Sequence, residues 1–262
     1  MDGGTVNKES SRANYKLIVA YKGTEYKGWQ KTSLGNSIEQ MLEKSIFQIL
    51  RKQVQLQAAS RTDAGVHAEG QVVNFLTDTP LSDLRRFLYG LNGTLPQNIR
   101  VLSIEPMPLQ FHPTIDATCK HYTYWICNHE VQVPFYRQLS WHFPYPLNIS
   151  LMEKEARHLL GTHDFSSFCN ERSLWTRSPV CTIDAINIIL HEGDRLSICF
   201  KGDHFLYKMV RNLAGTLVYV GCGKIPPDTI PSILEDKARA LAGVTAPAHG
   251  LTLKEVFYSR ST

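Results

Sequence analysis

The sequence predicts an α+β protein built from two successive β-α-β-β-α-β halves with mainly antiparallel sheets, of the ferredoxin-like or RRM-like kind. Alternating apolar and polar residues indicate the strands, and apolar residues at helical spacing indicate the helices. The same order of elements returns after a proline-containing join at residues 106–113. We therefore expect a disordered tail over residues 1–13, an N-terminal half over 14–110 and a C-terminal half over 111–262.

The first half begins with an apolar strand, followed by a capped helix. Ser37 and Gln40 form a capping box, and apolar residues then repeat at helical spacing as far as Leu50. Ser82 is expected to cap a second helix. The expected elements are, in order, a strand over 15–21, the capped helix, strands over 54–58 and 71–75, a helix over 84–91 and a strand over 99–104.

The second half repeats this order with longer elements. Ser150 and Glu153 form a second capping box, which predicts a helix running to Gly161. In each half the helices should cover one face of the sheet and leave the other face free for a ligand. The remaining expected elements are strands over 117–127, 180–190, 195–201 and 251–257, a long helix over 204–220 and a helix beginning near Pro231.

The composition indicates a globular protein without a membrane segment. Apolar residues make up 43% of the 262 residues and charged residues 20%, which is ordinary for a soluble domain. No apolar run approaches the roughly 20 residues that a membrane-spanning helix needs. The polar first 14 residues contain no apolar core of a signal peptide. The sequence therefore predicts a cytoplasmic protein.

The sequence lacks the binding motifs of several classes of cofactor. The six cysteines contain no C-x-x-C pair and the ten histidines no H-E-x-x-H cluster, so we expect no metal. There is also no phosphate-binding P-loop and no convincing dinucleotide-binding glycine motif. The net charge of +4 is spread evenly over both halves. A nucleic-acid partner would therefore have to bind a folded, locally basic surface.

The densest chemical feature is the loop over residues 59–71, with the sequence ASRTDAGVHAEGQ. Small and turn-forming residues surround Asp63 between two expected strands, and Gly65 and Gly70 permit a sharply bent backbone. Such a loop can present a carboxylate as a nucleophile. An aspartate before a small residue and a glycine is, however, more often a plain turn residue. Glu69 is the only other acid in the loop, which argues weakly against a paired-carboxylate glycosidase.

Two further segments hold candidate site residues. In the strand over 117–127, alternation places Lys120, Tyr122 and Tyr124 on one face, as stacking on a base beside a phosphate would require. The commoner alternative is that these tyrosines pack in the core. In the helix over 204–220, an apolar stripe faces inward.

The opposite face of that helix carries Lys208, Arg211, Asn212 and Gly215. Arg211 can form a bidentate pair with a carboxylate, although most helix arginines are simply solvated. Gly215 weakens the helix by about 1 kcal/mol relative to alanine, which indicates that another backbone or a ligand comes close.

Three blocks together resemble the TruA-type tRNA pseudouridine synthases. They are YKGTEYKGWQ at 21–30, SRTDAGVHAEGQVVNF at 60–75 and HFLYKMVRNLAG at 204–215, with PAHGL near the end. They stand in the order of that family, and the resemblance extends from about Tyr15 to Tyr258.

The resemblance implies the pseudouridine synthase fold, the isomerisation of uridine in the anticodon stem-loop of tRNA, a homodimer and no cofactor. It also implies roles for individual residues. Asp63 would be the nucleophile, Arg211 its carboxylate partner and Tyr122 the residue that packs against the target base. Arg61 would displace the base or contact phosphate. We also expect Lys120 and Lys208 to bind the substrate RNA. Lys120 and His121 stand where the family commonly has arginines, and Lys22 where it commonly has an acid.

Two alternatives from other classes remain open on the sequence. A non-catalytic RNA-binding protein with tandem RRM-like sheets would explain the order of elements and the aromatic strand, but not an acid in the sharpest loop, since a carboxylate repels phosphate. A nucleoside hydrolase or glycosylase that uses the same aspartate would release free base.

Overall fold

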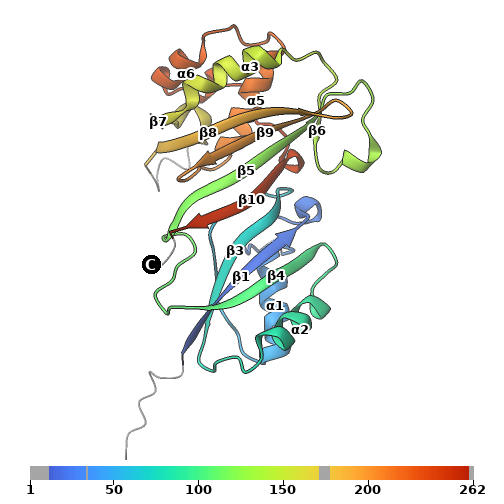
Figure 1. The fold of residues 1–262 in the computed structure, drawn as a ribbon, viewed down its shortest axis with the longest axis vertical. Coiled ribbons are helices and arrows are strands. Elements are labelled where there is room, and N and C mark those ends of the chain that lie inside the picture. Colours follow the sequence, from blue (N-terminus) through green and yellow to red (C-terminus); the bar gives the residue numbers. More distant parts are fainter. Residues whose placement is uncertain (1–11, 34, 171–177, 260–262) are drawn as a thin grey trace, which may run out of the picture.

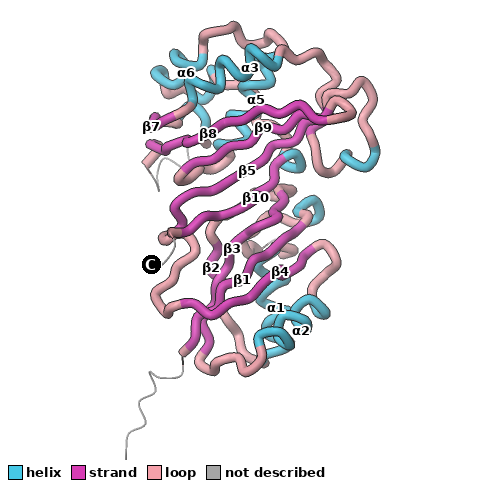
Figure 2. The backbone as a smooth tube through the Cα atoms, in the orientation of Figure 1, coloured by secondary structure: helices cyan, strands magenta, loops and turns pink. Residues whose placement is uncertain are grey.

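The computed structural model describes residues 12–33, 35–170 and 178–259. One continuous sheet runs the length of the molecule, in the strand order β4-β1-β3-β10-β5-β9-β8-β7 (Figures 1 and 2). Strand β2 pairs with β3, and β6 pairs with β5. Among the described strands, only β10 with β3 and β6 with β5 are parallel pairs. The predicted α+β class with a mainly antiparallel sheet is confirmed.

The N-terminal elements follow the predicted β-α-β-β-α-β order. Leu17 and Val19 of the first strand are fully buried beneath the first helix, which contributes Ile38, Leu42 and Ile46. Each such side chain stabilises the fold by about 1.5–3 kcal/mol on burial. The elements are β1 (Ala13–Tyr21), η2 (Gly23–Glu25), α1 (Ile38–Leu50), β2 (Leu56–Ala58), β3 (His67–Thr77), α2 (Leu84–Thr94) and β4 (Ile99–Met107).

The C-terminal elements keep the predicted order and add short elements between the main ones. They are β5 (Ala117–Cys127), η3 (Pro134–Tyr136), β6 (Trp141–His142), α3 (Ile149–Ala156), η4 (Arg157–Leu159), β7 (Gly161–Asp164), η5 (Ser166–Phe168), β8 (Val180–His191), β9 (Arg195–Gly202), α5 (Met209–Gly221), α6 (Ile230–Asp236), η6 (Arg239–Leu241), η7 (Ala248–Gly250) and β10 (Leu251–Tyr258).

Strand β10 connects the two ends of the sheet. It pairs in parallel with β3 at Thr252 and Leu253, and antiparallel with β5 along nearly all its length. The division into halves at residue 110 stays a prediction, because the strands of both regions belong to one sheet.

Several predicted boundaries differ from the structure. Asn148 rather than Ser150 caps α3, and its side chain accepts from the N–H of Leu151. This helix ends at Ala156, well before Gly161. Asp83 rather than Ser82 caps α2. Ala13, assigned to the tail, begins β1, while the rest of the predicted tail up to residue 11 lies outside the described residues.

Helices α1 and α5 lie on the same side of the sheet, behind it in the view of Figure 1, and α2 packs against α1 and β4. Helix α5 contacts β5, and α3 packs on α5 and β8. Within the described part of the chain, no helix combines the length and the apolar character needed to cross a membrane.

Candidate active site

Asp63 occupies the first position of a tight turn between β2 and β3. The N–H of Val66 donates to the carbonyl of Asp63 at 3.1 Å, and Gly65 adopts a φ of 84°, which favours glycine. The backbone therefore forms the turn that an aspartate before a small residue and a glycine predicts. The carboxylate does not serve that turn, because its oxygen accepts a hydrogen bond from Arg211.

Arg211 joins the Asp63 loop to a second segment of chain. Its Nη1 donates to Oδ2 of Asp63 at 2.6 Å, and its Nε donates to the carbonyl of Ala246 at 2.8 Å. The N–H of Ala246 in turn donates to the carbonyl of Arg211 at 3.1 Å. The two charged side chains are only 13% and 15% exposed. The guanidinium thus spans a carboxylate and a carbonyl, rather than meeting the carboxylate with both arms.

The polar face of α5 is covered by another segment of the chain. A Cβ on Gly215 would lie 1.8 Å from the carbonyl oxygen of Val244, so only glycine fits there. This confirms that the costly glycine marks the close approach of another backbone. Asn212 is fully buried beside it, and its side-chain oxygen accepts from Arg239 and Thr245. The segment over residues 239–246 covers this face.

The three sequence blocks meet around the Asp63 loop. The N–H of Trp29, from the first block, donates to the carbonyl of Thr62 at 3.0 Å. Gly28, with a φ of 93°, lies so close that a Cβ would stand 2.8 Å from the same carbonyl oxygen. On the other side, a Cβ on Gly65 would stand 3.3 Å from Ala248. The loop is therefore held between residues far apart in the sequence.

Tyr122 lies beside the loop on the predicted face of β5. Its hydroxyl is 2.6 Å from Oγ of Ser60, and its ring packs edge-on against Phe205 with centroids 5.3 Å apart. Burial, opposed by the Ser60 hydrogen bond and aided by the nearby charge of Asp63, raises the pKa of Tyr122 to about 12. The hydroxyl is therefore protonated at neutral pH. Phe205 had no role in the sequence analysis, although it lies in the third block.

The three residues expected to bind RNA lie in different environments. Arg61 is exposed, next to the tightly held Thr62. Lys208 precedes α5 with a φ of 63°, and its Nζ lies 5.1 Å from the centre of the Tyr207 ring. This positive φ is the reason α5 begins at Met209 and not at residue 204. Lys120 is only 5% exposed, so its RNA contact stays a prediction.

His67 is a further residue of this region that sequence reasoning missed. The N–H of Gly23 donates to its Nδ1 at 3.0 Å, so Nδ1 carries no proton. Its Nε2 lies 3.1 Å from the carbonyl oxygen of His249 and therefore carries one. Burial lowers the pKa of His67. The neutral ring thus connects the first block to the chain just before β10.

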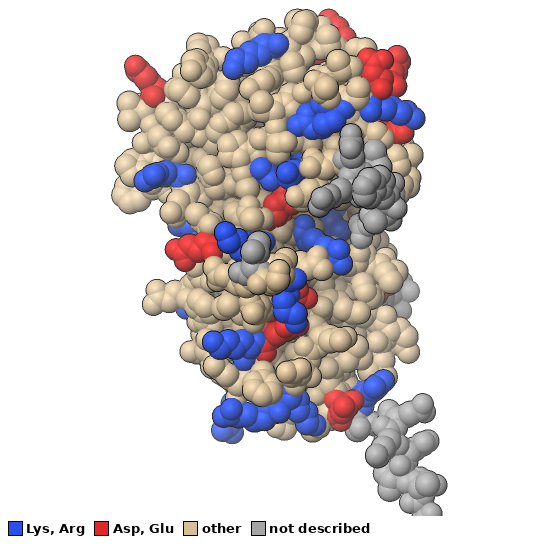
Figure 3. All heavy atoms as spheres, turned by 180° about the vertical axis from the view of Figure 1, so that it is seen from behind, with Lys and Arg blue, Asp and Glu red and all other residues tan. Residues whose placement is uncertain are grey.

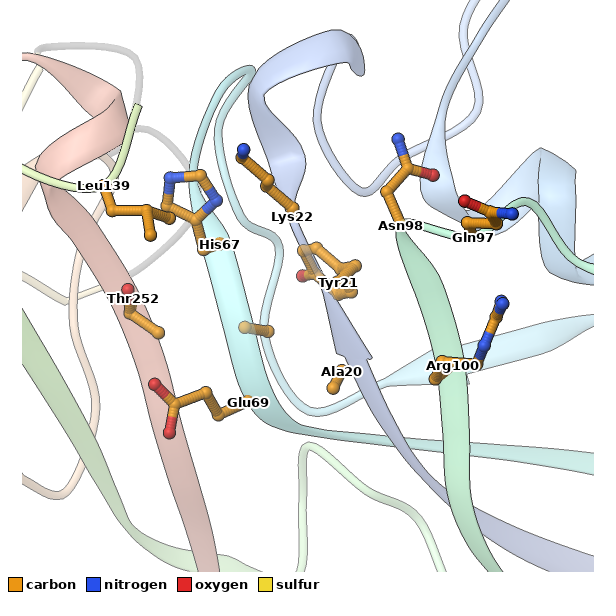
Figure 4. A pocket seen from close by; sticks show the side chains of 11 residues that line it. Ala20, Tyr21, Lys22, His67, Glu69, Gln97, Asn98, Arg100, Leu139 and Thr252 are labelled. Atoms are coloured by element: carbon orange, nitrogen blue, oxygen red, sulfur yellow. The ribbon is translucent and has the colours of Figure 1, made fainter. Parts of the chain in front are cut away.

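A cavity of about 530 Å³ opens over β1, β3, β4 and β10 (Figure 4). Lys22, His67, Glu69 and Arg100 are among the residues that line it. Asp63, Tyr122 and Arg211 are not part of this lining. Tyr21, whose hydroxyl lies 2.7 Å from Oγ1 of Thr62, also lines the cavity, so the cavity adjoins the residues around Asp63.

The catalytic candidates lie on the helix-covered side of the sheet, because Arg211 belongs to α5. That the helix-free face of the sheet binds the ligand stays a prediction, and the pair of Asp63 and Arg211 does not lie there. Seen from behind, Lys and Arg side chains are distributed over the face, with several around its middle (Figure 3). Asp and Glu side chains lie among them, so the locally basic surface stays a prediction.

One group of side chains in the described residues has ligand types that suit a metal ion. Atoms of Glu155, His158 and Asp228 lie within 4.8 Å of one another. Protein contacts already use two of them, since Lys154 pairs with Asp228 and the N–H of Asp228 donates to Glu155. Among the described residues, the side-chain partners of Asp63 and Arg211 do not include any of these three, so the group takes no part in that cluster.

Comparison with known proteins finds relatives over nearly the whole chain. A family model described as tRNA pseudouridine synthase matches residues 17–116 and 156–259. A protein of Protochlamydia amoebophila (strain UWE25) named tRNA pseudouridine synthase A 2 is 50% identical over 249 residues, which cover 95% of each chain. The tRNA pseudouridine synthase A of Thermoanaerobacter sp. (strain X514) is 42% identical over 245 residues, 94% of this chain and 99% of its own. Asp63 and Arg211 lie in the matched segments, and Tyr122 lies between them.

Proposed function

Because the chain belongs to the TruA family of tRNA pseudouridine synthases, which are isomerases, we propose that it converts uridine to pseudouridine in the anticodon stem-loop of tRNA with Asp63 as nucleophile. The observation that carries this proposal is the pair of Asp63 and Arg211, whose side-chain atoms lie 2.6 Å apart at the meeting point of the three sequence blocks. With membership of an enzyme family, the non-catalytic alternative loses its support.

The reaction breaks the bond between N1 of uracil and C1′ of ribose and forms a bond between C5 and C1′. The C5 proton leaves to solvent and N1 gains a proton, so no net oxidation or hydrolysis occurs. In this proposal Asp63 either adds to C6 of uracil or attacks C1′, and either step lets the base detach and rotate. The detached base must stay enclosed, because water would otherwise intercept the sugar.

The neighbouring residues have distinct tasks in this scheme. Arg211 holds the carboxylate through one hydrogen bond and is itself held by Ala246. Tyr122 packs against the target base, and its hydroxyl remains protonated because burial raises its pKa to about 12. Arg61 is exposed in the same loop as Asp63, where it can fill the space that the flipped nucleotide leaves. Flipping the base costs a few kcal/mol, which contacts of this kind offset.

We also propose that the protein acts in the cytoplasm as a homodimer. A net charge of +4 on one chain is modest for holding a tRNA, whose every phosphate is negative. Two copies would pool their basic surfaces on one substrate. Light scattering of the purified protein, alone and with tRNA, measures the number of copies directly.

The proposed reaction is tested by mapping pseudouridine at nucleotide resolution in tRNA treated with the purified protein. New pseudouridine should appear in the anticodon stem-loop with the wild-type chain. With Asp63→Asn, which keeps the size of the side chain, turnover should fall by about 10⁴-fold or more. Substantial turnover by that variant would contradict the role of Asp63, and release of free uracil would instead indicate a glycosylase.

A further inference from the structure

Gln71 lies at the centre of a buried hydrogen-bond network beneath the Asp63 loop. It belongs to β3 and is fully buried. Its side-chain nitrogen donates to the carbonyl of Ser60 at 2.6 Å, and its side-chain oxygen accepts from the N–H of Ser60 at 3.2 Å. The amide therefore binds both main-chain groups of one loop residue.

This side chain continues the strand ladder where the backbone cannot. The N–H of Ala59 donates to the carbonyl of Val72, which is the backbone bond nearest to the loop between these two segments. Beyond it the chain leaves the sheet, and the Gln71 amide takes the place of the next strand partner of Ser60. Buried main-chain groups without a partner would cost about 1–3 kcal/mol each. The loop thus departs from the sheet at a fixed point.

Through Tyr21, the Gln71 amide is also connected to Thr62, the residue that follows Arg61. The Gln71 nitrogen lies 3.4 Å from the Tyr21 hydroxyl, and this hydroxyl lies 2.7 Å from Oγ1 of Thr62. Tyr21 is 4% exposed, and burial raises the pKa of its hydroxyl, so it stays protonated and can donate to Thr62 while it accepts from Gln71.

The network also fixes the tyrosine of the site. Oγ of Ser60 lies 2.6 Å from the hydroxyl of Tyr122, so the residue that Gln71 holds is the one that holds Tyr122. Ser60 and Thr62 are both restrained, and Asp63 follows directly. Gln71 itself has no contact with Asp63 in the described structure; its contacts are with Ser60 and Tyr21.

We infer that Gln71 is a positioning residue for the isomerisation, which sets the place of the Asp63 carboxylate and of the Tyr122 hydroxyl together. The inference rests on the proposed function of Asp63. Misplacing a reacting group by about 1 Å can lower a rate on the order of 100-fold, so loss of the Gln71 contacts should appear in kcat. Binding of tRNA occurs over a much larger surface, and KM should stay unchanged.

Gln71→Met removes every hydrogen bond of the side chain at similar volume. We expect kcat for tritium release from 5-tritiated uridine in tRNA to fall on the order of 100-fold with KM unchanged. Asn74→Leu is the matched control, because Asn74 is also a fully buried amide of β3 but binds Asn14 and the carbonyl of Phe111, away from the loop. It should lower the thermal midpoint and leave kcat unchanged.

Gln71→Glu adds a readout that general loss of stability would not produce. Its ionised carboxylate cannot donate to the Ser60 carbonyl, whereas the protonated form can. The ratio of the kcat of Gln71→Glu to the kcat of Gln71→Met should therefore rise as the pH is lowered. Tyr21→Phe removes only the hydroxyl that connects Gln71 to Thr62, and it should lower kcat even where Gln71→Met fails to fold.

Unchanged kcat in both Gln71→Glu and Tyr21→Phe would overturn the inference. An equal loss of kcat in Asn74→Leu at an equal loss of thermal midpoint would also overturn it. In either case an active wild-type chain leaves the proposed function intact. If the wild-type chain itself releases no tritium, the proposed function fails and the inference fails with it.

Discussion

The guanidinium of Arg211 donates to the carboxylate of Asp63 from a position 148 residues further along the chain. The same guanidinium donates to the carbonyl of Ala246. One side chain therefore connects the loop between β2 and β3, the start of α5 and the segment that precedes β10. The position of the proposed nucleophile depends on the packing of all three.

Arg211→Lys should lower kcat although it keeps the charge. A lysine ammonium can reach either the Asp63 carboxylate or the Ala246 carbonyl, but it lacks the planar fork that serves both. A lost hydrogen bond to a charged group costs about 1.5–3 kcal/mol, which corresponds to a fall of about 10- to 100-fold. Steady-state tritium release measures it, with the exposed Arg157→Lys as control. A wild-type kcat in Arg211→Lys would contradict this.

Gly215→Ala should destabilise the protein and reduce activity. The new Cβ would lie 1.8 Å from the carbonyl oxygen of Val244, so one of the two backbones must move. Overpacking of this kind costs about 1–3 kcal/mol, and the moved segment includes the Ala246 carbonyl that orients Arg211. Urea unfolding measures the loss of stability, and kcat of the folded fraction measures the displacement of the site.

Gly93→Ala is the matched control for this substitution. Gly93 also lies in a helix, α2, and a Cβ there would meet nothing within 4 Å. Alanine should therefore raise the free energy of unfolding, by about 0.4–1 kcal/mol. An equal change in the free energy of unfolding in both variants would contradict the predicted cost of the close approach at Gly215.

Tyr122→Phe should lower kcat by up to about tenfold, because the ring remains while the hydrogen bond to Ser60 is lost. The ratio of wild-type to variant kcat should stay constant from about pH 7 to about pH 10. This follows because burial raises the pKa of Tyr122 to about 12, so the hydroxyl stays protonated throughout that range. A ratio that falls steeply above about pH 9 would show that Tyr122 ionises there.

The free energy of unfolding should fall as the pH drops below about 6.5. Burial lowers the pKa of His67, and it also lowers the pKa values of His121 and His249. Between the lowered pKa of the folded state and the ordinary pKa of the unfolded state, the unfolded chain binds more protons. The stabilisation is therefore complete above the unfolded pKa and is lost as the pH falls towards the folded one.

His67→Asn isolates the share of His67 in this effect. The asparagine oxygen can accept from the N–H of Gly23 in place of Nδ1, but it does not titrate. Unfolding by urea between about pH 5 and about pH 8 should give a smaller change of stability than in the wild type. An identical pH dependence would mean that His67 does not contribute.

The sequence predicted those helix ends where a local signal coincides with the apolar stripe. Ser37 caps α1 as expected, because it immediately precedes the first buried residue of that helix. For α3 the capping pattern at Ser150 was wrong, since Asn148 stands two residues earlier and its side chain accepts from the N–H of Leu151. Several residues that can cap lay close together, and only packing distinguishes them.

The burial of the polar face of α5 could not be predicted from the sequence. Its apolar stripe was recognised, but Asn212 is covered by contacts with Arg239 and Thr245, which are distant in sequence. Only Gly215 gave a local sign, since a glycine in a helix interior needs a reason. Asp63 and Arg211 were predicted together from the family resemblance, whereas Gln71 looked like an ordinary residue of a strand.

Strand β10 lies between β3 and β5, yet it follows every other described strand along the chain. During synthesis the polypeptide emerges in sequence order, so the neighbours of β10 are made long before it. Contacts between residues far apart in sequence form slowly, because a long loop must close first. Strand β10 can therefore pair with β3 and β5 only after this region has been translated. The segment before β10, which holds Arg211, becomes ordered only at the same stage. A nascent chain can form the contacts of Gln71 with Ser60 and Tyr21 before it can supply Arg211, the partner of the Asp63 carboxylate.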